Sequence, residues 1–208
     1  MFAGLLSSSD AGWPDIESST MPMRYFQLPD DMYLPHRWEL GSLIGPDAQD
    51  VQPSLLRSGT PLEMQGRLKV SIETPGRPLD FTHAAYSIPI VHVRVASLLS
   101  EVAPDDVQFL RVDVPSQPDA YLVLNALHLI RCIDDERSTE VRYWEPEDGM
   151  PEKVGTYFSV AGLRIDPTKV GGARIFRTWG WTGALIVSED LKAALEQSGA
   201  TGMKFTPV

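Results

Sequence analysis

The stretch of residues 88–114 limits the possible folds more than any other part of the chain, because its hydrophobic period changes twice. It opens with an apolar run at residues 88–91, passes into helical spacing, and ends in a strand-like alternation over residues 107–114. Pro104 ends the helix, since it has no N–H to donate and crowds the preceding turn. The apolar residues at helical spacing are Val95, Leu98, Leu99 and Val102. The sequence therefore predicts a strand-helix-strand unit, which needs a sheet to pack on.

The C-terminal stretch repeats this pattern after a shift of 96 positions. The expected incoming strand is residues 184–187, Ser188 is the expected N-cap, and Gly199 suits the left-handed position after a helix. The shift aligns Val95 with Leu191, Leu99 with Leu195, Val107 with Met203, and Phe109 with Phe205. An internal duplication and a chance match between two short amphipathic helices both produce such an alignment, and the sequence leaves both open.

The bulk composition restricts the class of protein. A length of 208 residues allows one domain with a substantial core, and the apolar content is that of a soluble globular chain. The formal net charge of −10 opposes binding to nucleic acid or to an anionic membrane, and it permits a basic protein partner. The single cysteine is typical of a reducing compartment. No apolar run approaches a membrane span, and residues 1–6 are too short and too uncharged for a signal peptide, so we expect a cytoplasmic protein.

Residues 1–22 are predicted to be a flexible leader, because residues 7–22 are rich in Ser, Asp, Gly and Pro and show no period. A single domain is expected from residue 23 to residue 208. Its first strand is the alternating segment at residues 24–28, directly after Met21 and Met23. The sequence leaves open whether translation starts at Met1, Met21 or Met23.

The rest of the chain favours strands over helices. Residues 120–133 contain Tyr, Val and Ile between flanking Pro and Asp, which favours a bent strand, or a hairpin turning at Asn125 and Ala126. Residues 45–59 are expected to be a loop. Further strand candidates are residues 38–41, 68–72, 157–165 and 174–179. We therefore predict a single mixed α+β domain with more strand than helix, containing two short strand-helix-strand units.

The histidines and the cysteine do not have the spacing of a metal site. His128 and Cys132 are four residues apart and would share one face of a strand, but no second pair completes a zinc site. We predict no metal site and no cofactor, and we expect Cys132 to be a buried core thiol. The four histidines are His36, His83, His92 and His128.

The sequence contains no phosphate-binding loop, no dinucleotide fingerprint and no nucleophile elbow. We therefore predict that the protein is not an enzyme. The alternative is a small cytoplasmic enzyme with a cryptic site near His128, Cys132 and Asp134, in which the thiol is the nucleophile. Ile130 and Ile133 weigh against this alternative, because apolar surroundings do not favour a thiolate.

Trp179 and Trp181 flank a glycine and form a second aromatic feature. Two indoles in this arrangement can stack on a sugar or a base. Packing in the core or at a sheet edge is the commoner role of such residues, and we expect it here.

The segment at residues 134–152 departs most strongly from the average composition, with eight carboxylates and two arginines. One interpretation is a solvated, mobile loop that keeps the protein soluble. The other is a docking surface for a cationic partner, in which Tyr143 and Trp144 are anchors. The predicted partner-binding residues are Asp134, Asp135, Glu136, Glu140, Tyr143, Trp144, Glu145, Glu147 and Asp148.

Several short motifs occur in one order along the chain: PGRPLDF at residues 75–81, APDDVQ at 103–108, CID at 132–134, LRID at 163–166, LIVSE at 185–189 and TGMKFTPV at 201–208. Together they resemble the Imm11 immunity proteins, a family also described as a DUF1629 domain. The resemblance covers nearly all of the chain from Arg24 onward, whereas the residues before Met21 depart from the pattern.

The resemblance implies a cytoplasmic immunity protein, encoded beside a polymorphic bacterial toxin, that binds and neutralises that toxin. Toxins near such genes often resemble nucleases of the HNH type, including those with an AHH motif, so the resemblance implies a basic nuclease as the partner. The family has no catalytic residues to carry over. Oligomeric state, and the choice between active-site occlusion and exosite binding, are left open by the sequence.

Overall fold

The computed structural model describes residues 23–118 and 120–208, so the predicted leader lies outside the described residues. The described chain contains thirteen strands, two α-helices and five short 3₁₀ helices. The strands are β1 Tyr25–Gln27, β2 Glu39–Ile44, β3 Leu68–Thr74, β4 Phe81–Ala84, β5 Ile88–His92, β6 Val107–Asp113, β7 Tyr121–Ala126, β8 Leu129–Ile130, β9 Glu140–Tyr143, β10 Tyr157–Ala161, β11 Ile175–Thr178, β12 Trp181–Ser188 and β13 Thr206–Pro207. The helices are α1 Val93–Val102, α2 Glu189–Gln197, η1 Leu55–Arg57, η2 Ala85–Ser87, η3 Pro146–Asp148, η4 Pro151–Lys153 and η5 Pro167–Lys169.

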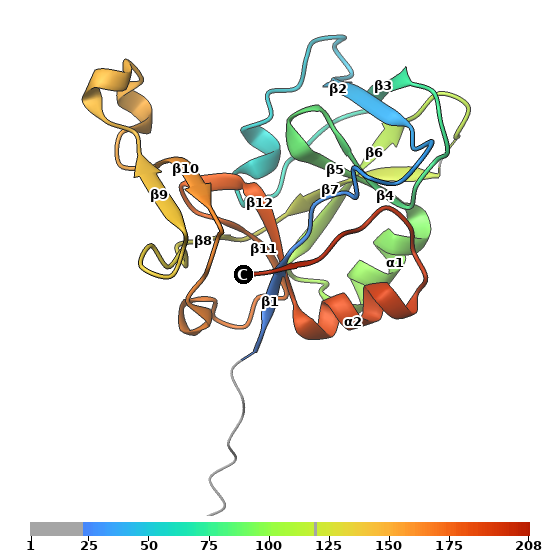
Figure 1. Ribbon diagram of the computed structural model, residues 1–208. Helices are drawn as coiled ribbons and strands as arrows, with labels where there is room; N and C mark the ends of the chain where they lie inside the picture. Colours follow the sequence, from blue (N-terminus) through green and yellow to red (C-terminus); the bar gives the residue numbers. More distant parts are fainter. Residues whose placement is uncertain (1–22, 119) are drawn as a thin grey trace, which may run out of the picture.

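The strands form three sheets. A six-stranded sheet has the order β2-β3-β6-β7-β5-β4, a five-stranded sheet has the order β13-β1-β12-β11-β8, and β9 pairs with β10 alone. The helices α1 and α2 lie side by side at one end of the body, and the β9–β10 pair stands out at the opposite end (Figure 1). The predicted single α+β domain, richer in strand than in helix, is confirmed.

Both predicted strand-helix-strand units form, and their connectivity is the same. In the first unit β5 and β6 flank β7, which runs antiparallel to both. In the second unit β12 and β13 flank β1, which again runs antiparallel to both. The aligned helical residues are buried in one core cluster; they are Val95, Leu99, Leu191 and Leu195. The middle strand follows the first unit in the chain but precedes the second, so the pseudo-repeat comprises the helices and their flanking strands only.

The ends of α2 show where local signals are reliable. Ser188 is the N-cap, as predicted, but its hydroxyl bonds to the Asp190 carboxylate and does not cap a backbone N–H. Gly199 has a φ of 63°, which confirms the left-handed position after the helix. Met203 makes only an isolated bridge to Asp30, so the strand expected there is shorter and begins at Thr206.

Residues 120–133 contain two separate strands, β7 and β8, which do not pair with each other, so the stretch is neither one continuous bent strand nor a hairpin. The strands β7 and β8 belong to different sheets, because Leu127 bonds to the Asp106 carbonyl and β8 then pairs in parallel with β11. The strand predicted at residues 157–165 ends early at Ala161, where Gly162 takes a φ of 55°. A side chain at Gly162 would overlap Thr139. The loop expected at residues 45–59 contains the short helix η1.

Three hydrophobic clusters hold the molecule together. The first packs both helices against both large sheets, and the second lies against the other face of the six-stranded sheet around Trp38. The third joins the five-stranded sheet to the β9–β10 pair and includes Cys132, Tyr157 and Phe176. Neither α-helix in the described part of the chain has the length and apolar character needed to cross a membrane.

Candidate functional site

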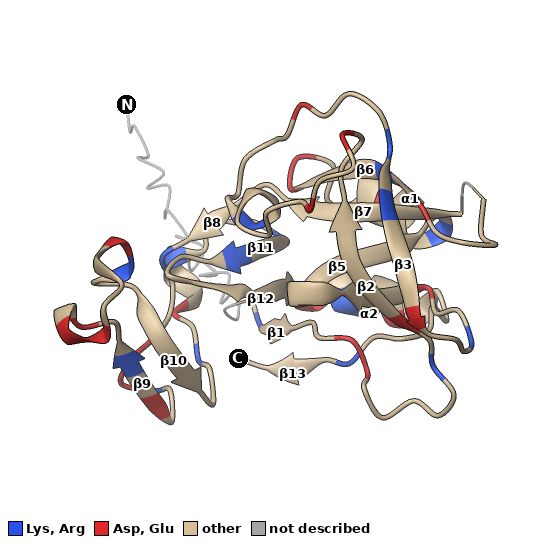
Figure 2. Ribbon diagram, turned by 90° about the horizontal axis from the view of Figure 1, so that it is seen from above, with Lys and Arg blue, Asp and Glu red and all other residues tan. Residues whose placement is uncertain are grey.

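Residues 140–161, called the arm below, protrude from the body as β9, η3, η4 and β10 (Figure 1). Most of the predicted partner-binding residues fall on it, and the acidic segment at residues 134–152 contains β9 and the two short helices η3 and η4. Figure 2 shows acidic residues at the tip of the arm and at the start of β9. The inner side chains of the arm, Val141, Tyr157 and Val160, pack into the third core cluster. The arm is therefore attached to the body by one apolar face.

Asp134 and Asp135 lie in the turn at the base of the arm. The Asp134 carboxylate accepts the backbone N–H of Arg137 at 3.1 Å, which closes this turn. The Asp135 carboxylate accepts the hydroxyl of Tyr143 and, at 2.9 Å, the hydroxyl of Tyr157. Burial, followed by its bonds to Tyr143 and Asp135, raises the pKa of Tyr157. These two aspartates hold the arm in place, and Asp135 remains exposed.

The other predicted carboxylates of the acidic segment divide into bonded and free groups. Glu145 and Asp148 cap η3 reciprocally: Asp148 Oδ2 accepts the N–H of Glu145 at 2.9 Å, and the Glu145 side chain accepts the N–H of Asp148. Glu136, Glu140 and Glu147 are exposed, and none forms an ion pair with another described residue. The free carboxylates therefore project their charge into solvent.

Exposed apolar side chains accompany these charges on the arm. Tyr143 is 41 % exposed, Met150 37 %, Val154 44 % and Phe158 37 %. A β-bulge at Phe158 separates the paired residues Tyr157 and Ser159, so Tyr157 points inward. Charged groups beside exposed apolar side chains are typical of a protein-binding surface.

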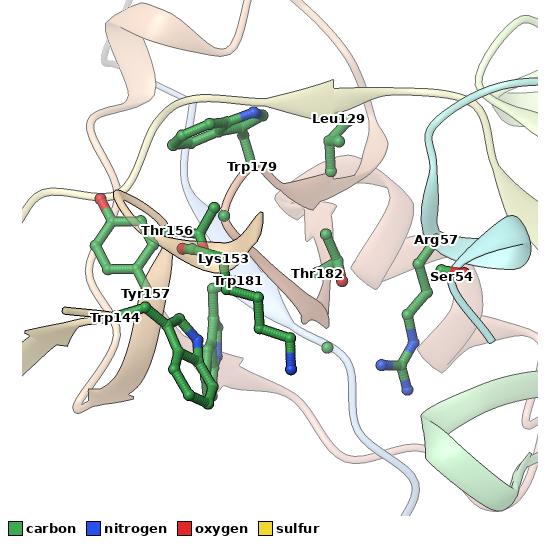
Figure 3. Close-up of a pocket in the computed structure, with 12 residues that line it drawn as sticks. Ser54, Arg57, Leu129, Trp144, Lys153, Thr156, Tyr157, Trp179, Trp181 and Thr182 are labelled. Carbon is green, nitrogen blue, oxygen red and sulfur yellow. The ribbon is translucent and has the colours of Figure 1, made fainter. Parts of the chain in front are cut away.

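Trp144, the second predicted anchor, faces a pocket between the arm and the body (Figure 3). Its indole is half-buried. The Phe158 ring meets it edge-on, with 4.7 Å between the ring centroids, and the Lys153 Nζ lies 4.7 Å from the indole centroid. The pocket encloses about 620 Å³ and also receives Trp179 and Trp181. Sequence reasoning noticed the two neighbouring tryptophans but missed the pocket, because Arg57 and Lys153 join them from distant parts of the chain.

The residues of the alternative catalytic site do not form a nucleophile and base. His128 Nε2 lies 2.9 Å from Asp106 Oδ1, and Asp134 closes the turn at the base of the arm. Cys132 is fully buried among apolar residues, and burial raises the pKa of its thiol to about 12. The prediction of a buried core thiol is confirmed. Within the described ranges, no three His, Cys, Asp or Glu side chains gather as a metal centre requires.

The arm combines acidic groups with exposed apolar side chains, which are the features of a surface that binds another macromolecule. The model of the Imm11 immunity protein family matches residues 15–208, so the chain belongs to this family. The match begins inside the segment predicted as a leader, earlier than the resemblance at Arg24 indicated. A comparison with curated proteins gives no match.

Proposed function

We propose that the protein neutralises a cognate toxin in the cytoplasm by binding it through the arm. The observation that carries this proposal is the coincidence, on the protruding arm and at its base, of exposed apolar side chains and unpaired carboxylates. Apolar contacts at the centre of an interface provide most of the binding energy, and charges at its rim steer the encounter. The family membership supports an immunity function for the protein.

The charge of the protein indicates a basic partner. A net charge of −10 attracts a cationic protein at long range and repels nucleic acid. A nuclease of the HNH or AHH type, encoded by a neighbouring gene, fits this requirement, because nucleases bind phosphates with lysines and arginines. The arm would occupy that basic surface in place of the nucleic acid.

The predicted residues then divide into three roles. Asp134 and Asp135 position the arm, and Glu145 and Asp148 shape its tip. Tyr143 presents an exposed ring, while Trp144 supports the exposed apolar side chains from the pocket side. The steering charges are Glu136, Glu140 and Glu147.

Association kinetics with the product of the neighbouring gene test the proposal. Changing the three free carboxylates to Gln should slow association about tenfold at low salt, and the effect should shrink at physiological salt, where the Debye length is about 8 Å. A matched control removes three exposed carboxylates from the body: Glu63→Gln, Glu101→Gln and Asp105→Asn. Equal slowing by both variants would place the interface away from the arm.

A further inference from the structure

The pocket between the arm and the body has an unusual charge for so acidic a protein. Twelve residues line it, and they include two cations and no carboxylate. Arg57 comes from η1 on the body and Lys153 from η4 on the arm, and their charged ends face the same space from opposite sides (Figure 3).

A third cation, Arg177, lies directly behind the wall of this pocket. It pairs with Leu129 between the strands, and its Nη1 donates to the Thr182 carbonyl at 2.8 Å, so two lining residues contact it. The side chain is 0 % exposed, and its Nε and Nη2 have no hydrogen-bond partner among the described residues. Burial, together with the nearby charge of Arg57, lowers the pKa of Arg177 to about 9.

Arg57 also has a buried nitrogen without a hydrogen-bond partner among the described residues. Its Nε is buried without a partner, and it forms no ion pair with any described carboxylate. Burial lowers the pKa of this guanidinium too. A guanidinium keeps its proton in proteins and offers five N–H donors, and a buried charge is expensive unless an opposite charge or hydrogen bonds compensate it. Two neighbouring arginines without a counter-ion indicate that an anion completes this site.

The walls of the pocket restrict what the anion is attached to. Trp181 presents aromatic surface beside the two cations, whereas Trp144 already has the Lys153 ammonium 4.7 Å from its centroid and Trp179 has the Arg131 guanidinium at 3.5 Å from its centroid. A volume of about 620 Å³ is much larger than a single phosphate or carboxylate and matches the pockets of drug-sized ligands. Gly183 keeps one side open, since a Cβ there would meet no atom within 4 Å.

We propose that this pocket binds a nucleoside phosphate, with its phosphate between Arg57 and Lys153 and its base stacked on Trp181. Arg177 strengthens the site from behind the wall without touching solvent. Arginine and lysine are the common phosphate ligands, and an aromatic face accepts any base. This site shares Trp144 with the proposed toxin-binding surface, but nucleotide binding does not depend on toxin binding.

Isothermal titration of the full-length protein with AMP, adenosine and inorganic phosphate tests the ligand class. AMP should bind saturably with one site per chain, and each fragment should bind about tenfold more weakly or worse, because it lacks either the charge-assisted bonds or the stacking. Absence of saturable AMP binding at millimolar concentration would overturn the proposal. Adenosine binding as tightly as AMP would also overturn it, since the cations would then have no role.

Two variants locate the site. Gly183→Val adds a branched side chain to the pocket lining, in a strand and where a Cβ would meet no atom within 4 Å, and should abolish AMP binding while the melting temperature stays unchanged. Arg57→Met should weaken AMP binding about tenfold or more. The matched control is Arg111→Met, an exposed arginine of β6 outside the pocket, which should bind AMP normally.

The last measurements test where AMP binds and whether another ligand competes with it. AMP that binds equally well to the Gly183→Val variant would lie elsewhere, and the proposal would be wrong. A short glutamate-rich peptide is the alternative occupant, because its carboxylates also pair with arginine. If that peptide displaces AMP and binds more tightly, the pocket is a peptide site and the proposal is overturned; if AMP remains bound, the proposal is supported.

Discussion

The arm and the helical end of the body are stabilised in different ways. The two α-helices bury Val95, Leu99, Leu191 and Leu195 in a cluster that also contains residues of both large sheets. The arm is a two-stranded pair that contributes mainly three inner side chains to the third cluster and uses its remaining surface for charge and exposed apolar groups. An isolated two-stranded hairpin is only marginally stable in water, and its stability depends on the surface that it packs against. The comparison indicates that the body determines stability and that the arm is available for recognition.

The largest effect is expected in the body. Leu191→Ala removes a fully buried side chain from α2 and should lower the free energy of unfolding by about 2–5 kcal/mol, because the cavity cannot close. Urea titration measures this loss. Toxin affinity of the folded fraction should not change, and a parallel loss of affinity would show that arm and body are not separate in function.

The next effect concerns Cys132, which lies where the arm meets the body. An unfolded thiol ionises near pH 8.5, whereas the buried thiol keeps its proton up to a pKa of about 12. The unfolded state therefore binds fewer protons above pH 8.5, and stability should fall by up to about 2 kcal/mol between pH 8.5 and pH 10. Urea titrations over this range measure the loss. Cys132→Ala should lose less stability over the same range, and an identical decline would assign the effect to other groups.

A smaller effect is expected at the base of the arm. Tyr157→Phe removes the hydroxyl that donates to Asp135 and should cost about 1 kcal/mol. Hydrogen exchange should show faster opening of the arm, at residues 140–161, with little change in α1 or α2. Uniformly faster exchange over the whole chain would show that the arm and the body unfold as one unit.

The smallest effect on stability is expected at the tip of the arm. Met150→Ser changes an exposed side chain and should alter the free energy of unfolding by about 0.5 kcal/mol or less. If Met150 fills a pocket on the toxin, dissociation should become about tenfold faster, which surface plasmon resonance measures directly. Val93→Ser on α1 is the matched control, as Val93 is equally exposed on the body. Unchanged dissociation in the Met150 variant would remove the tip from the interface.

Local sequence signals predicted the features that depend on neighbouring residues. The period of residues 93–102, the stop at Pro104 and the left-handed Gly199 specify the helices, since these effects act within one turn of the chain. The burial of Cys132 followed from its apolar neighbours. The acidic segment was visible in the composition alone.

Only the tertiary structure decided the features that join distant segments. The strand β8 pairs with β11, nearly fifty residues later in the chain. The hairpin interpretation instead paired the two halves of residues 120–133, which are closer in sequence, and it was incorrect. The folding of the acidic segment into an arm depends on Asp135 meeting Tyr157. The pocket depends on Arg57, Lys153 and Arg177, which lie in three elements and have no common motif. The sequence by itself thus determined the helices, the acidity and the buried thiol, and the pairing of distant strands decided the arm and the cationic pocket, because such pairing depends on packing that no local pattern encodes.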